Sequence, residues 1–365
     1  MATRRAFVHR VPMGAPDDVS ALQAAMAQGR IDPAAIVAIL GKTEGNGCVN
    51  DFTRGFASMV LARTLAAASP ATADGVCLVM SGGTEGGLSP HATVIESRAT
   101  DEPAEAGALA VGRARTRPLP AEHLGRREQV DSVADGVRTA MADAGIADPR
   151  DVHFVQVKCP LLTAGRVAEA EARGQRTATR DTLKSMGLSR AASALGVGLA
   201  LDEIPLTTAF DTVIGTDFSV YSGRASTSAG VELAEHEIVV LGTAPGWAGP
   251  LRIDHAVMAD GLDVEPVRAA LARLGLEAAG QLDPHQRGRL VALLAKAEAG
   301  STGRLRGFRH TMLDDSDLSA TRHARGFVAG ALGSLVGHAE IYVSGGAEHQ
   351  GPDGGGPVAL IVSSR

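Results

Sequence analysis

Three apolar runs, each ending at a lysine, divide the chain into similar stretches. The runs are AIVAILGKTEG, VHFVQVKCP and RLVALLAKAEAG, and their lysines are Lys42, Lys158 and Lys296. Short apolar runs bounded by glycine or proline are typical of buried strands. We therefore predict three buried strands with a lysine at the end of each.

Each lysine is followed by a stretch with helical character that carries an arginine near its beginning. These stretches are VNDFTRGFASMVLARTL, MGLSRAASALGVGLAL and SATRHARGFVAGALGSL, with Arg54, Arg190 and Arg325. Asn50 and Ser189 belong to the residue types that cap helix N-termini. We expect the first two helices to begin at these residues.

A second predicted strand then ends at a serine. The segments GVCLVMSGG, DFSVYSGRASTSAG and AEIYVSGGAE place Ser81, Ser226 and Ser344 there. The order lysine, arginine, serine thus occurs three times, although a solvated side chain or a structural turn would explain any one of these residues alone. The repetition predicts a triplicated unit in which strands and helices alternate.

Two linker-like stretches separate the predicted units. The first, ATDEPAEAGALA, is acidic and rich in alanine, and the second, GTAPGWAGPLR, is rich in proline and glycine. Such stretches are typical of connections between packed elements. The predicted units are residues 1–105, 106–249 and 250–365, and we expect a sheet covered by helices in each.

The composition narrows the class of protein. The chain has 365 residues, of which 45% are apolar and 21% charged, with a net charge of −6. These values fit a soluble globular protein and argue against nucleic acid as the main partner. Aromatic residues make up 3% and glycine reaches 44 residues. We therefore expect an aliphatic core and many turns that need glycine.

Cysteine usage and hydropathy indicate the compartment. Cys48, Cys77 and Cys159 have neither the spacing of a metal site nor that of a disulfide framework. The N-terminal segment lacks the continuous apolar region of an export signal, and no apolar run reaches the roughly 18 residues of a membrane span. We expect a cytoplasmic protein.

The repeated residue types point to nucleophilic chemistry on a small ligand. A serine is a weak nucleophile unless a base takes its proton, and a lysine acts as a base only where burial or nearby cations lower its pKa. Three lysines and three arginines gathered at one point would supply these cations. The glycines after Ser81 and Ser344 leave backbone N–H groups free to bind oxygen atoms. The expected ligand is small, anionic and rich in carbonyl groups, with three similar faces.

The same segments resemble those of the cyclic amide hydrolase family, which contains the cyanuric acid hydrolases and the barbiturases. The resemblance covers essentially the whole chain. It rests on LGKTEGNGCVNDFTRGFA, VMSGGTEGGLSPH, VQVKCPLLT, GRASTSAG, APGWAGPLRIDHAVMAD and SGGAEHQGPDGGGPVA, in the family's order. It implies an α/β fold in which three similar repeat units form a pseudo-threefold barrel with the active site on its axis. It also implies a homotetramer.

The resemblance assigns roles to individual residues. It implies that the middle unit performs the reaction, with Ser226 as the nucleophile and Lys158 as the general base. The residues alone leave this choice open among the three pairs. Lys42 and Lys296 would support the other two serines. The ring carbonyls would be held by Arg54, Ser81, Gly82, Arg190, Thr227, Arg325, Ser344 and Gly345.

A divalent cation near the C-terminal glycine loop is also implied by the resemblance, with a structural rather than a catalytic role. Its ligands would be the Glu298 carboxylate, the Gln350 side chain and the carbonyl oxygens of Ala347, Gly351, Pro352 and Gly355. Hard oxygen ligands of this kind suit Mg²⁺ or Ca²⁺. We expect no cofactor in the reaction itself.

The expected function is the ring-opening hydrolysis of a cyclic amide. Cyanuric acid would give carboxybiuret, which loses CO₂ to form biuret. Barbituric acid, in which a CH₂ replaces one ring N–H, is the alternative substrate, and a non-catalytic binder of small cyclic anions is the alternative from another class. The near-identical serine turns and the TRGF and ARGF segments of the first and third units favour the symmetric ring.

Overall fold

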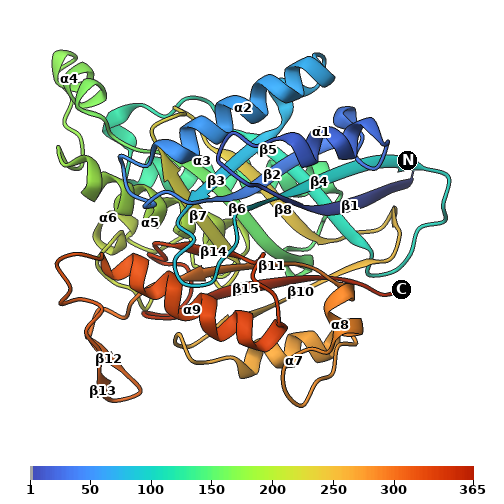
Figure 1. The fold of residues 1–365 in the computed structure, drawn as a ribbon. Helices are drawn as coiled ribbons and strands as arrows, with labels where there is room; N and C mark the ends of the chain where they lie inside the picture. The colour runs from blue at the N-terminus through green and yellow to red at the C-terminus, as the bar shows by residue number, and fades with distance from the viewer. Residues whose placement is uncertain (1–2) are drawn as a thin grey trace.

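Three sheets with one shared strand order form the framework of the protein. The computed structural model describes residues 3–365 and shows a mixed α/β fold (Figure 1). In each sheet the lysine-bearing strand has two neighbours. One is the parallel strand that carries the serine, and the other is the antiparallel strand that follows the serine strand in the sequence and is the last of its unit in that sheet. The first strand of each unit pairs with that last strand. The predicted threefold alternation of strands and helices is therefore present.

The first sheet has the order β3-β2-β4-β1-β9, in which the short β9 adds to the shared pattern. Its strands are β1 (Thr3–Pro12), β2 (Ile36–Thr43), β3 (Cys77–Gly82), β4 (His91–Thr100) and β9 (Trp247–Ala248). Two helices belong to this part of the chain, α1 (Ser20–Ala27) and α2 (Phe52–Ala68). Helix α2 connects the lysine strand to the serine strand and contacts both.

The second sheet has the order β5-β8-β6-β7. Its strands are β5 (Leu109–Arg115), β6 (Val152–Pro160), β7 (Ala225–Gly230) and β8 (Glu237–Thr243). The helices of this part are α3 (Arg127–Ala144), α4 (Ala164–Ala172), α5 (Thr182–Ala200) and the short α6 (Phe210–Val213). Helices α3 and α5 pack against each other, α3 on β5 and β8 and α5 on β6 and β7, so together they cover one face of the sheet.

The third sheet has the order β10-β15-β11-β14. Its strands are β10 (Leu251–Met258), β11 (Leu290–Ala297), β14 (Tyr342–Gly345) and β15 (Gly356–Ser363). The helices are α7 (Glu265–Arg273), α8 (Pro284–Arg289) and α9 (Ala320–Val336), and a small hairpin consists of β12 (Arg304–Leu305) and β13 (Phe308–Arg309). Figure 1 shows this hairpin projecting from the body of the protein below α9.

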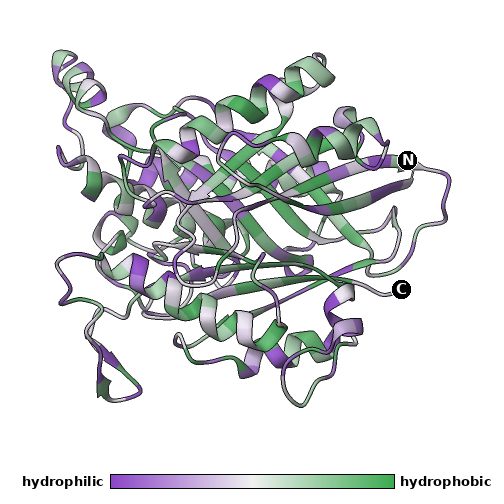
Figure 2. Ribbon diagram, viewed as in Figure 1, coloured by the Kyte–Doolittle hydropathy of each residue, from purple (hydrophilic) through white to green (hydrophobic). Residues whose placement is uncertain are grey.

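The sheets pack against one another but keep separate hydrogen-bonded ladders over residues 3–365. Strand β1 contacts β5 and β11, and β10 contacts β6 and β8. One apolar cluster joins the three lysine-bearing strands through Leu40, Val157 and Leu294, and Figure 2 shows the central strands as largely hydrophobic. The strands thus form a shared aliphatic core, but the described residues do not form the closed barrel that was expected.

Two helices begin at residues other than those predicted. Helix α2 is capped by Asp51, whose carboxylate accepts the N–H of Thr53, so the Asn50 prediction is wrong by one residue. Helix α5 is capped by Asp181, and Ser189 lies within the helix. The segment between these two residues extends the helix by two turns that the apolar pattern did not reveal. No helix in residues 3–365 is long and apolar enough to cross a membrane.

Candidate active site

Strand register brings the lysines of the outer units opposite their serines. Lys42 on β2 pairs with Ser81 on β3, and Lys296 on β11 pairs with Ser344 on β14. In both pairs the lysine Nζ donates a hydrogen bond of 3.2 Å to the serine Oγ. The structure therefore brings these predicted pairs together at the carboxyl ends of parallel strands.

The middle unit corrects one assignment. Lys158 on β6 lies opposite Ser228, not Ser226. Ser226 lies opposite Gln156 and donates a hydrogen bond of 2.8 Å to its Oε1 atom. Both serines of the STSAG segment point to the same face of β7, because side chains alternate along a strand. Apolar pattern alone could not choose between them, whereas matching Ser-Ala-Gly to the Ser-Gly-Gly turns would have selected Ser228.

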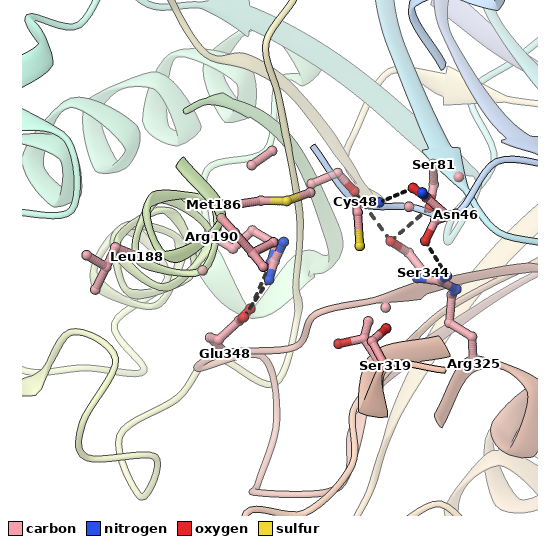
Figure 3. A pocket seen from close by; sticks show the side chains of 18 of the residues that line it. Asn46, Cys48, Ser81, Met186, Leu188, Arg190, Ser319, Arg325, Ser344 and Glu348 are labelled. Carbon is pink, nitrogen blue, oxygen red and sulfur yellow. Dashed lines mark hydrogen bonds and ion pairs between the residues drawn. The ribbon is translucent and has the colours of Figure 1, made fainter. Parts of the chain in front are cut away.

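The three serines that match in register converge on one point. Ser81 Oγ donates to Ser344 Oγ over 3.1 Å, and the Oγ atoms of Ser228 and Ser344 are 3.4 Å apart. Figure 3 shows Ser81 and Ser344 facing each other at the inner end of a pocket. Three units that are far apart in sequence thus contribute one hydroxyl each to the same place.

A cavity of about 440 Å³ opens onto these hydroxyls. Most of the residues expected to bind the substrate line it, namely Arg54, Ser81, Gly82, Arg190, Arg325, Ser344 and Gly345. Ser228 and Ala229 line it as well. This volume lies at the lower end of the range for small-molecule sites, so the cavity suits a compact ring.

Thr227 is not among the residues that line this cavity. Its hydroxyl donates to the carbonyl of Arg190 over 3.1 Å, and its backbone N–H donates to the Gln350 side chain over 2.6 Å. Because it alternates with Ser228 along β7, its side chain lies on the other face of the strand. Ala229 takes the place that the sequence analysis gave to Thr227.

The glycines after the outer serines allow close approach of neighbouring groups. A Cβ atom on Gly82 would lie 1.7 Å from Asp51 Oδ2, and one on Gly345 would lie 2.4 Å from Thr321 Cγ2. Neither position tolerates a side chain without displacing its neighbour. The glycines that directly follow Ser81 and Ser344 are thus required by packing.

Lys42 and Lys296, the lysines of the first and third units, are buried, and their surroundings disfavour the charged form of each side chain. Burial is the main cause that lowers the pKa of Lys42 well below its usual value, and a neighbouring arginine adds to it. Burial and the nearby Arg190 lower the pKa of Lys296 to about 7. The sequence analysis expected lowered pKa values from gathered cations, whereas in the structure burial is the larger cause and the arginines add to it.

Lys158 has a different environment. Its Nζ atom forms an ion pair of 2.7 Å with Glu232 and donates to the carbonyl of Met80 over 3.1 Å. Burial alone would raise the pKa of Glu232, but attraction to Lys158 outweighs it and lowers this pKa to about 2. The sequence analysis missed Glu232, which lies four residues after Ser228.

The arginines link each unit to the next. Arg325 of the third unit forms an ion pair of 2.7 Å with Glu85, which lies four residues after Ser81. Arg190 of the second unit pairs with Glu348, four residues after Ser344, with an Nε to Oε2 distance of 2.8 Å (Figure 3). An acidic residue four positions after the serine therefore recurs in all three units, and the sequence analysis did not take this repeat into account.

Arg54 breaks this symmetry. Its Nη1 atom donates to the carbonyl of Ala229 over 3.1 Å, and its Nε atom lies 3.4 Å from Asp51. By analogy with the other units its partner would be Glu232, but Glu232 pairs with Lys158 instead. In the middle unit the acid that follows the serine therefore pairs with a lysine, whereas in the other two units it pairs with an arginine.

A buried tyrosine that the sequence analysis did not single out lies next to the serines. The Tyr342 hydroxyl is fully buried and makes no hydrogen bond within the described part of the chain. Burial raises its pKa to about 12, while the three serine hydroxyls act in the opposite direction. Tyr342 lies two residues before Ser344, where the other units have Val79 and Ser226. The base of the site is thus not threefold symmetric.

The predicted cation ligands lie in two segments of the third unit, with Glu298 directly after β11 and the others on the loop between β14 and β15. Glu298 is buried, and burial together with the nearby Glu348 carboxylate raises its pKa. Its Oε2 atom accepts only a 3.2 Å hydrogen bond from the N–H of Ala347, so a hard cation would compensate this carboxylate well. The Gln350 side-chain oxygen, in contrast, is already bound to the N–H of Thr227. The carbonyls of Gly351, Pro352 and Gly355 belong to the same loop.

Known proteins resemble this chain along its whole length. A family model described as amidohydrolase ring-opening protein matches residues 7–363. A cyanuric acid amidohydrolase from Bradyrhizobium sp. (strain ORS 375) is 63% identical over 98% of both chains. One from Methylobacterium sp. (strain 4-46) is 60% identical, over 98% of this chain and 97% of its own.

Solved structures agree with these sequence relatives. The crystal structure of a cyanuric acid hydrolase from A. caulinodans is 62% identical, covers 99% of both chains and superposes with a TM-score of 0.91. A second cyanuric acid hydrolase structure is 46% identical, with 99% of this chain and 100% of its own covered and a TM-score of 0.93. This chain therefore belongs to the family of amidohydrolase ring-opening proteins.

Proposed function

We propose that this protein hydrolyses cyanuric acid by opening its ring. The observation that carries the proposal is the whole-chain identity of 63% to cyanuric acid amidohydrolases. The site geometry supports it, because three units direct one serine each to the end of a small cavity. A planar ring with three equivalent carbonyl groups matches three such units around an axis.

Ser228 is the proposed nucleophile, and Lys158 is the proposed general base. Lys158 removes the Oγ proton, and the alkoxide attacks a ring carbonyl carbon. Backbone N–H groups of the serine turns and the arginine charges stabilise the oxyanion. The C–N bond then breaks as Lys158 protonates the departing nitrogen. Water hydrolyses the acyl-enzyme to carboxybiuret and restores the serine proton, and loss of CO₂ gives biuret.

The asymmetry of the middle unit supports its selection. Lys42 and Lys296 each donate to their own serine, whereas Lys158 is held by Glu232 in this structure. Lys158 must move from Glu232 toward Ser228 to act as a base. Glu232 would then be free to pair with Arg54, as the equivalent acids of the other units pair with their arginines.

Barbituric acid is the second candidate substrate, and a rate comparison distinguishes the two. A site that binds all three ring N–H groups of cyanuric acid has a polar protein group opposite each of them. With barbituric acid bound, the protein group opposite the CH₂ has no hydrogen-bond partner, which costs about 1–3 kcal/mol of binding free energy. We expect kcat/KM for cyanuric acid to exceed that for barbituric acid by at least about tenfold. Equal or faster barbituric acid hydrolysis would reverse the substrate assignment. No turnover of either ring would support a non-catalytic binder.

A structural Mg²⁺ or Ca²⁺ in the C-terminal loop is proposed as part of this function. Glu298 would anchor it, with carbonyl oxygens of the loop from Ala347 to Gly355 as further ligands. The Gln350 oxygen accepts the N–H of Thr227 over 2.6 Å and keeps its second lone pair for the cation. Because this loop follows the turn of Ser344, the cation would fix the position of the third serine.

A further inference from the structure

A cluster of metal-binding side chains lies at the far end of β6 from Lys158. His153 is the second residue of β6, and Asp254 and His255 are adjacent on β10. Within residues 3–365 it is the one group of three or more histidine, cysteine or acidic side chains with ligand atoms close enough to share an ion. It joins the second sheet to the third, away from the cavity that the serines line.

The distances within the cluster match a transition-metal site. The Nδ1 atoms of His153 and His255 are 2.9 Å apart, and Asp254 Oδ1 lies 3.6 Å from the first and 4.0 Å from the second. Three atoms with these separations share a point about 2.1 Å from each of them, the distance of nitrogen and oxygen ligands from Zn²⁺. This point lies in the plane of the three atoms, so the two imidazoles, which are within hydrogen-bond distance of each other without an ion, must move slightly apart to give a tetrahedral site. Two imidazoles and a carboxylate are also the ligand types that this class of metal prefers.

Neighbouring charged groups hold the carboxylate of this cluster in place. Arg273 donates to Asp254 Oδ2 over 2.6 Å and orients the carboxylate, while Oδ1 accepts the backbone N–H of His255 over 2.7 Å and keeps a lone pair for an ion. Arg224, the other cation near the histidines, is bound to Glu203 and to backbone carbonyls.

We propose that His153, Asp254 and His255 form a binding site for a divalent transition metal of the zinc class. The side chains are partly exposed, with 14% to 29% of their surface accessible, so water can fill a fourth coordination position. The metal connects β6 to β10 and thereby stabilises the packing of the second sheet on the third. It takes no part in the reaction, because its ligands lie at the other end of β6 from Lys158.

Cobalt(II) tests this site directly, because its tetrahedral complexes absorb visible light. The metal-stripped protein is titrated with Co²⁺ in the presence of excess Mg²⁺, which keeps hard-oxygen sites filled. We expect one Co²⁺ per chain with a visible absorption band, displaced by Zn²⁺. His153→Ala and His255→Ala should each weaken binding by at least about tenfold. His285→Ala, which changes an exposed histidine on α8, should bind as the native protein does.

Thermal unfolding provides the second readout. Zn²⁺ should raise the Tm of the native protein and of His285→Ala, but not that of the other two variants. The stripped variants are melted first, so a folding defect is seen separately from a binding defect. A native protein without the absorption band would overturn the proposal. An unchanged band in the His153→Ala/His255→Ala double variant would do the same, because the metal would then lie elsewhere.

Discussion

At the scale of single residues, Lys158 differs from its counterparts in the partner of its ammonium group. Lys42 and Lys296 contact serine hydroxyls, while Lys158 contacts a carboxylate. In this position the Lys158 Nζ atom contacts Glu232 and the carbonyl of Met80 rather than the hydroxyl of Ser228. The proposed reaction therefore needs a second arrangement of the middle unit, in which lysine and acid have separated.

This arrangement should be visible when a ring occupies the cavity. In a crystal structure with barbituric acid or another substrate-like ring bound, we expect Lys158 Nζ within about 3.2 Å of Ser228 Oγ, an ordinary hydrogen-bond distance. Glu232 should then contact Arg54. The unliganded crystal serves as the control. A Lys158–Glu232 ion pair that stays intact around the bound ring would remove Lys158 as the base for Ser228.

At the scale of secondary-structure elements, Asp51 connects the start of α2 to the site. Its carboxylate accepts N–H groups of Thr53 over 3.0 Å and of Gly47 over 2.9 Å, and it lies 3.4 Å from Arg54. The same carboxylate fills the space that the missing Cβ of Gly82 leaves free. One helix cap thus positions an arginine and a serine turn together.

Removing this cap should affect substrate binding as well as stability. Asp51→Ala should lower the free energy of unfolding by about 1–2 kcal/mol, as loss of an N-cap does, and should raise KM for cyanuric acid several-fold because Arg54 loses its support. The matched control is Asp283→Ala, which removes the capping box of α8, a helix that does not line the cavity. If KM changes equally in both variants, or in neither, Asp51 does not position Arg54.

At the scale of the whole molecule, the repeated order of lysine, arginine and serine could be recognised in the sequence, because the strands and turns that carry these residues each have a local sequence pattern. Apolar runs predicted the buried strands, and serine-glycine turns predicted where the second strands end. Strand register and the contacts between units are long-range properties. Which acid pairs with which arginine therefore required the structure, as for Arg190 with Glu348 and Arg325 with Glu85. The choice of Ser228 over Ser226 did not, because Ser-Ala-Gly aligns with the Ser-Gly-Gly turns of the other two units.

The proposed loop cation should contribute to the stability of the whole chain. A chelator should lower Tm by at least about 2 °C, and Mg²⁺ or Ca²⁺ should restore it, because the buried Glu298 carboxylate is otherwise left beside Glu348. Restoration by Zn²⁺ alone would point to the histidine cluster instead. In Glu298→Gln the response to Mg²⁺ or Ca²⁺ should vanish. A native protein whose Tm ignores the chelator would show that no such cation is bound.

The central claim is that Ser228, opposite Lys158, attacks the ring. Its most direct test is kcat for cyanuric acid in Ser228→Ala and Ser226→Ala, measured side by side on proteins with matching thermal melts. We expect Ser228→Ala to lose at least about a thousandfold in kcat and Ser226→Ala to stay within about tenfold of the native enzyme, since only the former removes a nucleophile. Near-native turnover by Ser228→Ala, with or without loss in Ser226→Ala, would contradict the assignment.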